Sequence, residues 1–166
     1  MGVYSLSKSG INNWSKYSNI AGSNGQTSDF ELIGSQFLTA SVSSVTFANL
    51  QNYSQYKHLQ LRIAVRSDYA GASDDWGLLR FNGDSGANYS LHLIRGTGST
   101  VFSSAGLTNT AAQINDFPDA ADAASTFGAS IVDILDFQST TKNKTLRSLV
   151  SSQSSNIVEL VSNAWY

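Results

Sequence analysis

The stretch Gly83-Asp84-Ser85-Gly86 carries residue types that could do chemistry. A serine acts as a nucleophile when a base lies within hydrogen-bond reach and a carboxylate orients that base. His58 is a candidate base upstream, and Asp68 or Asp75 could orient it. Together these residues would make a hydrolase of the serine type.

The spacing of these residues argues against a catalytic triad. His58 and Ser85 are only 27 positions apart (85 − 58). Chymotrypsin-like proteases, in which Gly-Asp-Ser-Gly surrounds the nucleophile, spread their triad over two β-barrels and need a longer chain. The Gly that usually follows this motif is Ala87 here. We therefore predict no catalytic residues and no enzymatic activity.

The same motif has the composition of a turn. Asn-Gly and Asp-x-Gly tolerate positive φ, and Asp84 and Asn88 can bond nearby backbone amides. WGLLRFN precedes the motif and YSLHLIRG follows it, and both have strand composition. The sequence thus predicts a hairpin turn, with Ser85 as an ordinary turn serine.

Acidic side chains near the turn raise the question of a metal site. Asp74, Asp75, Asn82 and Asp84 offer the hard oxygens that calcium prefers, but without the spacing of an EF-hand. The chain has no Cys, which excludes thiolate metal sites and disulfides. We predict no metal and no other cofactor, with calcium at Asp74, Asp75 and Asp84 as an open alternative.

Two aromatic residues are candidates for glycan contact. Tyr69 lies in the loop SDYAGASDD and Trp76 follows it directly. Exposed aromatic rings on β-sandwiches stack on sugars in many carbohydrate-binding modules. Most Trp and Tyr side chains in a small sandwich instead pack in the core or at an interface. Both interpretations stay open at this stage.

Composition limits the partners. The 166-residue chain suits a single domain, and only 13% of its residues are charged, with a formal net charge of −2. No basic stripe is present, so we predict no nucleic-acid binding. No apolar run approaches the roughly 20 residues of a membrane span, and the N-terminus lacks the apolar core of a signal peptide, so we predict no membrane partner.

Residues 58–67 give the clearest strand signal, because apolar and polar residues alternate strictly. Residues 97–125 are rich in Gly, Ala and polar residues, and we expect a long loop there. The pattern predicts an all-β protein, an antiparallel β-sandwich of jelly-roll type. The other expected strands are 30–38, 43–50, 76–82, 89–96, 129–137, 144–150 and 156–165.

Residues 1–29 differ from the rest of the chain. Isolated apolar residues stand among polar ones, and the segment ends in Gly-Ser-Asn-Gly. Such anchors cannot form a core by themselves, so we predict an extended docking arm ahead of a sandwich domain at 30–166; an extension packed on its own domain is the alternative. The expected docking residues are Tyr4, Leu6, Ile11, Trp14 and Tyr17.

Nearly the whole chain resembles a family of virion β-proteins from cyanophages and other marine tailed phages. The most specific matching segments are KHLQLR (57–62), RFNGDSGANYS (80–90) and DILDFQSTTKNKT (133–145). The resemblance implies a structural component of the particle, such as a capsid decoration or cement protein, a fibre or a tail appendage. No catalytic residues come with it.

The resemblance also implies partners and a location. We expect a homo-oligomer, a trimer first of all, that docks on the major capsid protein or another virion protein through residues 1–29. Its place would be the capsid surface or the tail, after synthesis in the bacterial cytoplasm. The alternative is a host-recognition module of a tail or fibre that binds cell-surface glycans.

Similar sequences usually continue past Asn163-Ala164-Trp165 into further strands, whereas this one stops at Tyr166. A missing strand would leave an open sheet edge, which proteins normally cover or pair. We therefore expect residues 157–166 to be completed by a neighbouring chain or by further residues.

Overall fold

The computed structural model describes residues 30–71, 75–152 and 156–166. The chain divides into two compact units, Met1–Phe47 and Ala48–Tyr166. The predicted arm and its anchors at Tyr4, Leu6, Ile11, Trp14 and Tyr17 lie outside the described residues. The arm and its boundary at residue 29 therefore stay predictions.

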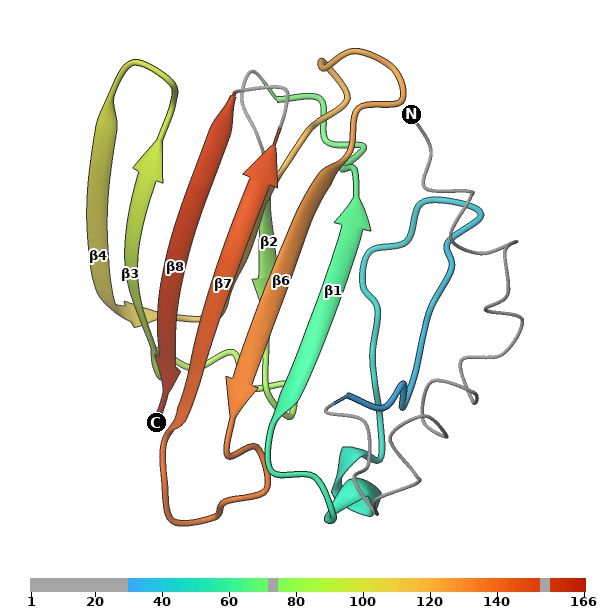
Figure 1. The fold of residues 1–166 in the computed structure, drawn as a ribbon, viewed down its shortest axis with the longest axis vertical. Helices are drawn as coiled ribbons and strands as arrows, with labels where there is room; N and C mark the ends of the chain where they lie inside the picture. Colours follow the sequence, from blue (N-terminus) through green and yellow to red (C-terminus); the bar gives the residue numbers. More distant parts are fainter. Residues whose placement is uncertain (1–29, 72–74, 153–155) are drawn as a thin grey trace, which may run out of the picture. The chain divides into compact units, whose positions relative to one another are not determined.

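The second unit is built from antiparallel strands. A six-stranded sheet has the order β1-β6-β7-β8-β3-β4, and β2 pairs with β5 in a small second sheet. In Figure 1 the large sheet faces the reader and β2 lies behind it. The two sheets pack together, which confirms the predicted all-β sandwich, although its layers are unequal. The strands are β1 (Leu59–Val65), β2 (Asp75–Leu79), β3 (Tyr89–Gly96), β4 (Val101–Asn109), β5 (Ala112–Phe117), β6 (Gly128–Leu135), β7 (Lys144–Ser152) and β8 (Ile157–Trp165), preceded by the 3-10 turn η2 (Leu50–Tyr53).

The core lies between the large sheet and β5. The alternation in β1 turns Leu59, Leu61 and Ile63 inward, as predicted, while Arg62 and Ala64 stay exposed. β7 alternates most regularly, with every second side chain buried from its first residue to its last. The fully or almost fully buried apolar cluster consists of Tyr89, Ala112, Ile114, Val132, Ile134 and Leu146.

β8 is a central strand, so the expectation of an open edge at residues 157–166 was wrong. It pairs with β7 on one side, where Leu160 faces Leu149, and with β3 on the other, where Leu160 faces Ile94. After β1 the chain passes through β2 of the small sheet, and β3 then returns to the large sheet. There β3 pairs with the side of β8 that faces away from β7. Instead, β1 and β4 form the edges of the large sheet.

The predicted loop at 97–125 was also wrong, because it contains β4 and β5. β4 is an edge strand, and most of its side chains are exposed on both faces. Its sequence therefore shows no alternation of apolar and polar residues. In β5 the small residue Ala112 is completely buried, which allows the second layer to approach the large sheet closely. The small side chain of Ala112 is here a packing requirement and does not mark a loop.

The strands expected at 30–38 and 43–50 do not form; of those residues, only Leu50 enters a regular element, the η2 turn. Phe30, Leu32 and Phe37 are largely exposed in this segment. A strand needs a partner for its backbone groups, and the sheets of the described residues include none of these. Strand composition alone was therefore insufficient.

Candidate functional site

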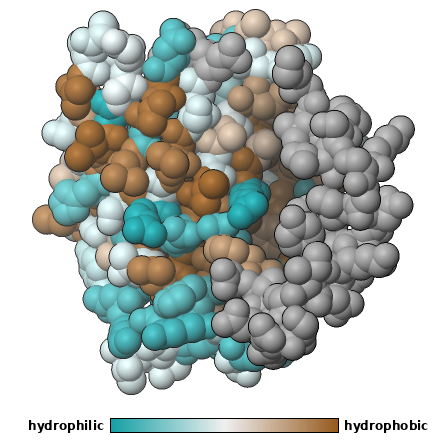
Figure 2. Space-filling view, viewed as in Figure 1, coloured by the Kyte–Doolittle hydropathy of each residue, from teal (hydrophilic) through white to brown (hydrophobic). Residues whose placement is uncertain are grey.

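An uninterrupted row of aliphatic side chains crosses the outer face of the large sheet. The cross-strand register places Ile131 of β6 beside Leu149 of β7, Leu149 beside Leu160 of β8, and Leu160 beside Ile94 of β3. All four side chains are exposed, Leu149 by 55%. Figure 2 shows hydrophobic residues gathered on this face, over the strands of the large sheet. We call these four residues the outer row.

The neighbouring positions extend this surface in two directions. On one side Val158 and Val101 face the two sides of Gly96, and both valines are exposed. On the other side the Arg147 guanidinium lies 3.0 Å from the Asp133 carboxylate. Such an exposed pair contributes little to stability and leaves this part of the face with balanced charge.

A shallow hollow of about 390 Å³ lies where the outer row meets this ion pair, lined by Ile131, Leu149, Leu160, Asp133 and Arg147. The Gln60 amide donates to Asp133 over 3.0 Å, and this bond and the one from Arg147 lower the pKa of the carboxyl group. The carboxylate is thus fixed in its charged form next to apolar surface. An apolar centre with a charge-balanced polar border is typical of association surfaces.

The Gly-Asp-Ser-Gly stretch forms a turn, but it does not close a hairpin. Asn82 and Gly83 have φ values of 52° and 71°, and the Asp84 amide donates to the Phe81 carbonyl over 2.9 Å. The flanking strands belong to different sheets, since β2 pairs with β5 while β3 pairs with β4 and β8. The turn therefore carries the chain from one layer to the other.

Asp84, and not Ser85, is the residue of this turn that makes the contacts. Its carboxylate accepts hydrogen bonds from Trp165 Nε1 at 2.7 Å, from Asn88 Nδ2 at 2.9 Å and from the Gly86 amide at 2.8 Å. Ser85 is exposed. The turn thus ties β3 to the end of β8, where Trp165 also packs on Phe81 at 5.1 Å between ring centres.

The residues considered for a triad lie in separate arrangements. His58 accepts the Asp136 amide on Nδ1 over 3.0 Å, and Asp75 accepts a bond from the Ser67 hydroxyl over 2.6 Å. Within the described part of the chain, no hydrogen bond joins His58 to Ser85. His58 thus contacts the chain just after β6, and Asp75 contacts the chain just after β1.

The described residues give the calcium alternative no geometric support. Asp74 lies outside the described residues. Asp75 bonds Ser67, whereas Asp84 bonds Trp165, so the two acids serve different contacts. Over residues 30–71, 75–152 and 156–166, no group of three His, Asp or Glu side chains is placed to hold a metal ion.

Replacing Asp84 with Asn should reduce the loss of folding stability that occurs as the pH falls. Hydrogen bonds from Asn88, then Trp165, then Gly86 lower the pKa of Asp84 below its usual range. The unfolded chain therefore binds this proton more readily, so the stabilisation is complete above the usual pKa and is lost as the pH falls through the lowered one. The urea midpoint, followed from about pH 5 to about pH 2, should fall less steeply in Asp84→Asn than in the wild type.

Ser85→Ala is the matched control, because Ser85 is the exposed neighbour of Asp84. It should reproduce the wild-type profile. Equal profiles for Asp84→Asn and the wild type would show that the carboxylate does not support the turn.

Tyr69 and Trp76, the candidate glycan contacts, are both exposed, Trp76 by 60%. Trp76 lies on β2 of the small sheet, with exposed Leu78 two residues further along the strand. Neither aromatic ring therefore belongs to the core. This exposure leaves both rings accessible to a ligand.

The interior contains a charged cluster that the sequence reasoning missed. Arg95 of β3 donates through Nε to the Glu159 carboxylate of β8 over 2.6 Å and also pairs with Asp116 of β5. The Asp116 and Glu159 side chains are at most 1% exposed. One guanidinium thus joins two buried carboxylates across the sandwich. The position of Glu159 in an apolar strand was the only signal in the sequence.

Comparisons with known proteins add no relative: no family model, no curated protein and no solved structure matches the chain. Among the residues that the structure describes, none forms a helix long and apolar enough to span a membrane.

Proposed function

We propose that this chain is a non-enzymatic structural protein of a phage particle, a capsid decoration or cement protein or a head fibre. The observation that carries the proposal is the outer row, four exposed aliphatic side chains on four adjacent strands. A soluble protein rarely leaves such a surface uncovered unless it associates with another molecule. The resemblance of the sequence to phage virion β-proteins supports the same assignment.

The occupant that suits the outer row best is a second copy of the chain. Six strands spaced about 4.8 Å apart, each about 25 Å long, give a face of roughly 600 Å² before side-chain relief is counted. This approaches the roughly 800 Å² per partner of a stable interface. The Asp133–Arg147 pair beside the row is neutral as a whole, so this face brings no net charge to the surface of the neighbouring copy that covers it. A trimer is the proposed assembly.

Attachment to the particle is assigned to residues 1–29. This segment carries Tyr4, Leu6, Ile11, Trp14 and Tyr17 among polar residues. Aromatic and aliphatic anchors of this kind contribute most of the energy of interfaces with low charge. The partner is the major capsid protein or another protein of the virion.

Deleting residues 1–29 should abolish incorporation into particles while the sandwich remains folded. The strands of the described fold begin at Leu59, so the deletion removes none of them. Particles grown with the truncated gene should lack the protein by immunoblot, and the purified truncated protein should keep the wild-type circular dichroism spectrum. Incorporation at the wild-type level would refute the docking role of the arm.

A host-recognition module that binds cell-surface glycans is the second candidate, favoured by the exposure of both Tyr69 and Trp76. Glycan binding by the assembled protein should then be lost when Trp76 is replaced with Ala. A glycan array that stays blank for the assembled wild-type protein would count against this candidate.

A further inference from the structure

A second hollow, of about 330 Å³, lies at the C-terminal end of β8. The amide residues Asn82, Gln138 and Asn143 line it together with Trp165 and Tyr166, and the Gln138 side-chain amide donates to the Leu50 carbonyl over 3.1 Å. Its volume is at the lower end of the range for small-molecule sites. Neither the outer row nor the Tyr69 and Trp76 surface contributes to it.

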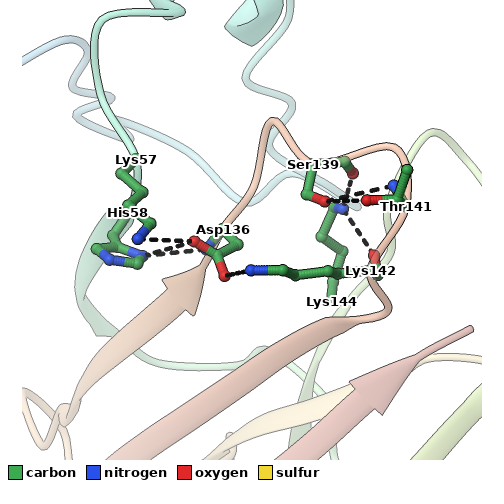
Figure 3. Close-up of polar contacts among 7 residues, drawn as sticks. All are labelled: Lys57, His58, Asp136, Ser139, Thr141, Lys142 and Lys144. Carbon is green, nitrogen blue, oxygen red and sulfur yellow. Dashed lines mark hydrogen bonds and ion pairs between the residues drawn. The ribbon is translucent and has the colours of Figure 1, made fainter.

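Lys144 supplies this hollow with a buried positive charge. The residue is 7% exposed, and its ammonium donates to the carbonyl oxygens of Ser139 and of Lys142, the latter over 3.1 Å (Figure 3). An ammonium has three donors, and the described residues supply an acceptor to two of them. In the described part of the chain no carboxylate lies within 4.0 Å of it, whereas nearby Lys142 pairs with Asp136 at 3.1 Å.

Burying a charge is costly unless it is compensated, and two neutral carbonyl groups compensate only part of it. The remaining donor and the remaining charge of Lys144 both favour an anion. A carboxylate would accept a short, charge-assisted hydrogen bond there. The lysine alone therefore predicts the charge of a ligand but not its class.

The walls of the hollow indicate the class. Rings pack on the C–H faces of sugars, and amide groups donate to and accept from sugar hydroxyls. The ring of Trp165 is fixed by its bond to Asp84, and the Tyr166 backbone donates to the Asn88 carbonyl over 3.1 Å. Such walls are pre-organised, which lowers the entropic cost of binding.

We infer that this hollow binds a saccharide that carries a carboxylate, such as a uronic acid, with the carboxylate on Lys144 and the ring against Tyr166. The inference goes beyond the structural role and does not depend on it. It also differs from the glycan surface at Tyr69 and Trp76, since it places the ligand at other residues and requires a negative charge.

The test is a titration of the ¹⁵N-labelled full chain with sodium glucuronate, followed by NMR. Glucuronate should shift the side-chain amide signals of Gln138 and Asn143 and should bind about tenfold more tightly than either glucose or acetate. Equal binding of glucose would overturn the role of Lys144. Equal binding of acetate would overturn the saccharide class, as would absence of binding by glucuronate.

A peptide with a free C-terminal carboxylate forms a further arm of the same experiment. If it binds more tightly than glucuronate, the hollow receives the end of a partner protein, and the saccharide inference is wrong.

Variants locate the site. Lys144→Gln should remove the tenfold preference for glucuronate over glucose. Because Lys144 also holds two loop carbonyls, this variant could fail to fold, and Tyr166→Ala, which leaves the ammonium in place, should then weaken glucuronate binding severalfold. Lys57→Met is the matched control, since Lys57 pairs with Asp136 at 3.8 Å but does not line the hollow. Binding that is insensitive to both site variants would overturn the inference.

Discussion

Replacing Arg95 with Met should lower the free energy of unfolding by about 3–5 kcal/mol, because it leaves two buried carboxylates without their shared cation. Arg95 contacts Glu159 at 2.6 Å and also Asp116, and the two carboxylates have almost no contact with solvent. An uncompensated buried charge costs far more than the ion pair itself contributes. Urea unfolding, followed by tryptophan fluorescence, measures the loss.

Two further variants separate this effect from the loss of any arginine. Arg147→Met breaks an exposed ion pair with Asp133 and should cost at most about 1 kcal/mol. Combining Arg95→Met with Asp116→Asn and Glu159→Gln removes the buried charges together and should recover a large part of the stability. If Arg95→Met costs no more than Arg147→Met, the buried cluster does not hold the two layers together.

Replacing Leu149 with Asp should weaken self-association at least about 30-fold, the equivalent of about 2 kcal/mol. Leu149 lies in the middle of the outer row, between Ile131 and Leu160. In the proposed assembly its side chain is buried by a second copy, so a carboxylate there would lose its hydration, and the nearby Arg147 is already paired with Asp133. Sedimentation over a range of protein concentrations measures the change.

The chain offers a closely matched control for this variant. Leu78 is also 55% exposed, but it lies on β2 of the small sheet. Leu78→Asp should therefore leave the wild-type mass, about 53 kDa for three chains of 17.8 kDa, unchanged. A wild-type protein that sediments as a single chain, or equal effects of the two substitutions, would contradict the assignment of the outer row.

Strands with clear alternation or a continuous apolar run were predictable from the sequence. Residues 58–67, 89–96, 144–150 and 156–165 overlap closely with β1, β3, β7 and β8. In these segments one face of the strand is buried and limits which residues are tolerated, so the pattern of residues in the sequence shows which face points inward. The same reasoning gave the sandwich.

The wrong predictions concern segments whose secondary structure or position depends on tertiary contacts. β5 was missed because its buried positions, Ala112, Ile114 and Asp116, combine a small, an apolar and a charged residue and so give no apolar alternation. Residues 30–38 have strand composition, but they belong to neither sheet of the described fold. The central position of β8 depends on the crossover through β2, which no local pattern encodes.

The candidate sites were predictable only in part. The Gly-Asp-Ser-Gly turn was expected, and the contacts of Asp84 with Asn88 and Gly86 follow from local turn chemistry. Its bond to Trp165 joins residues 81 positions apart and could not be foreseen. The outer row had a signal in the sequence, since residues 129–137 are apolar on both faces, but which face is open follows only from the second layer.

We propose that the chain is a structural component of the virion, and counting its copies in purified particles tests this most directly. Quantitative mass spectrometry of gradient-purified particles, with the major capsid protein as the reference, provides the number. We predict tens of copies or more per particle, in multiples that fit the symmetry of the head or tail. A protein that is abundant in infected cells but absent from the purified particles would contradict the account.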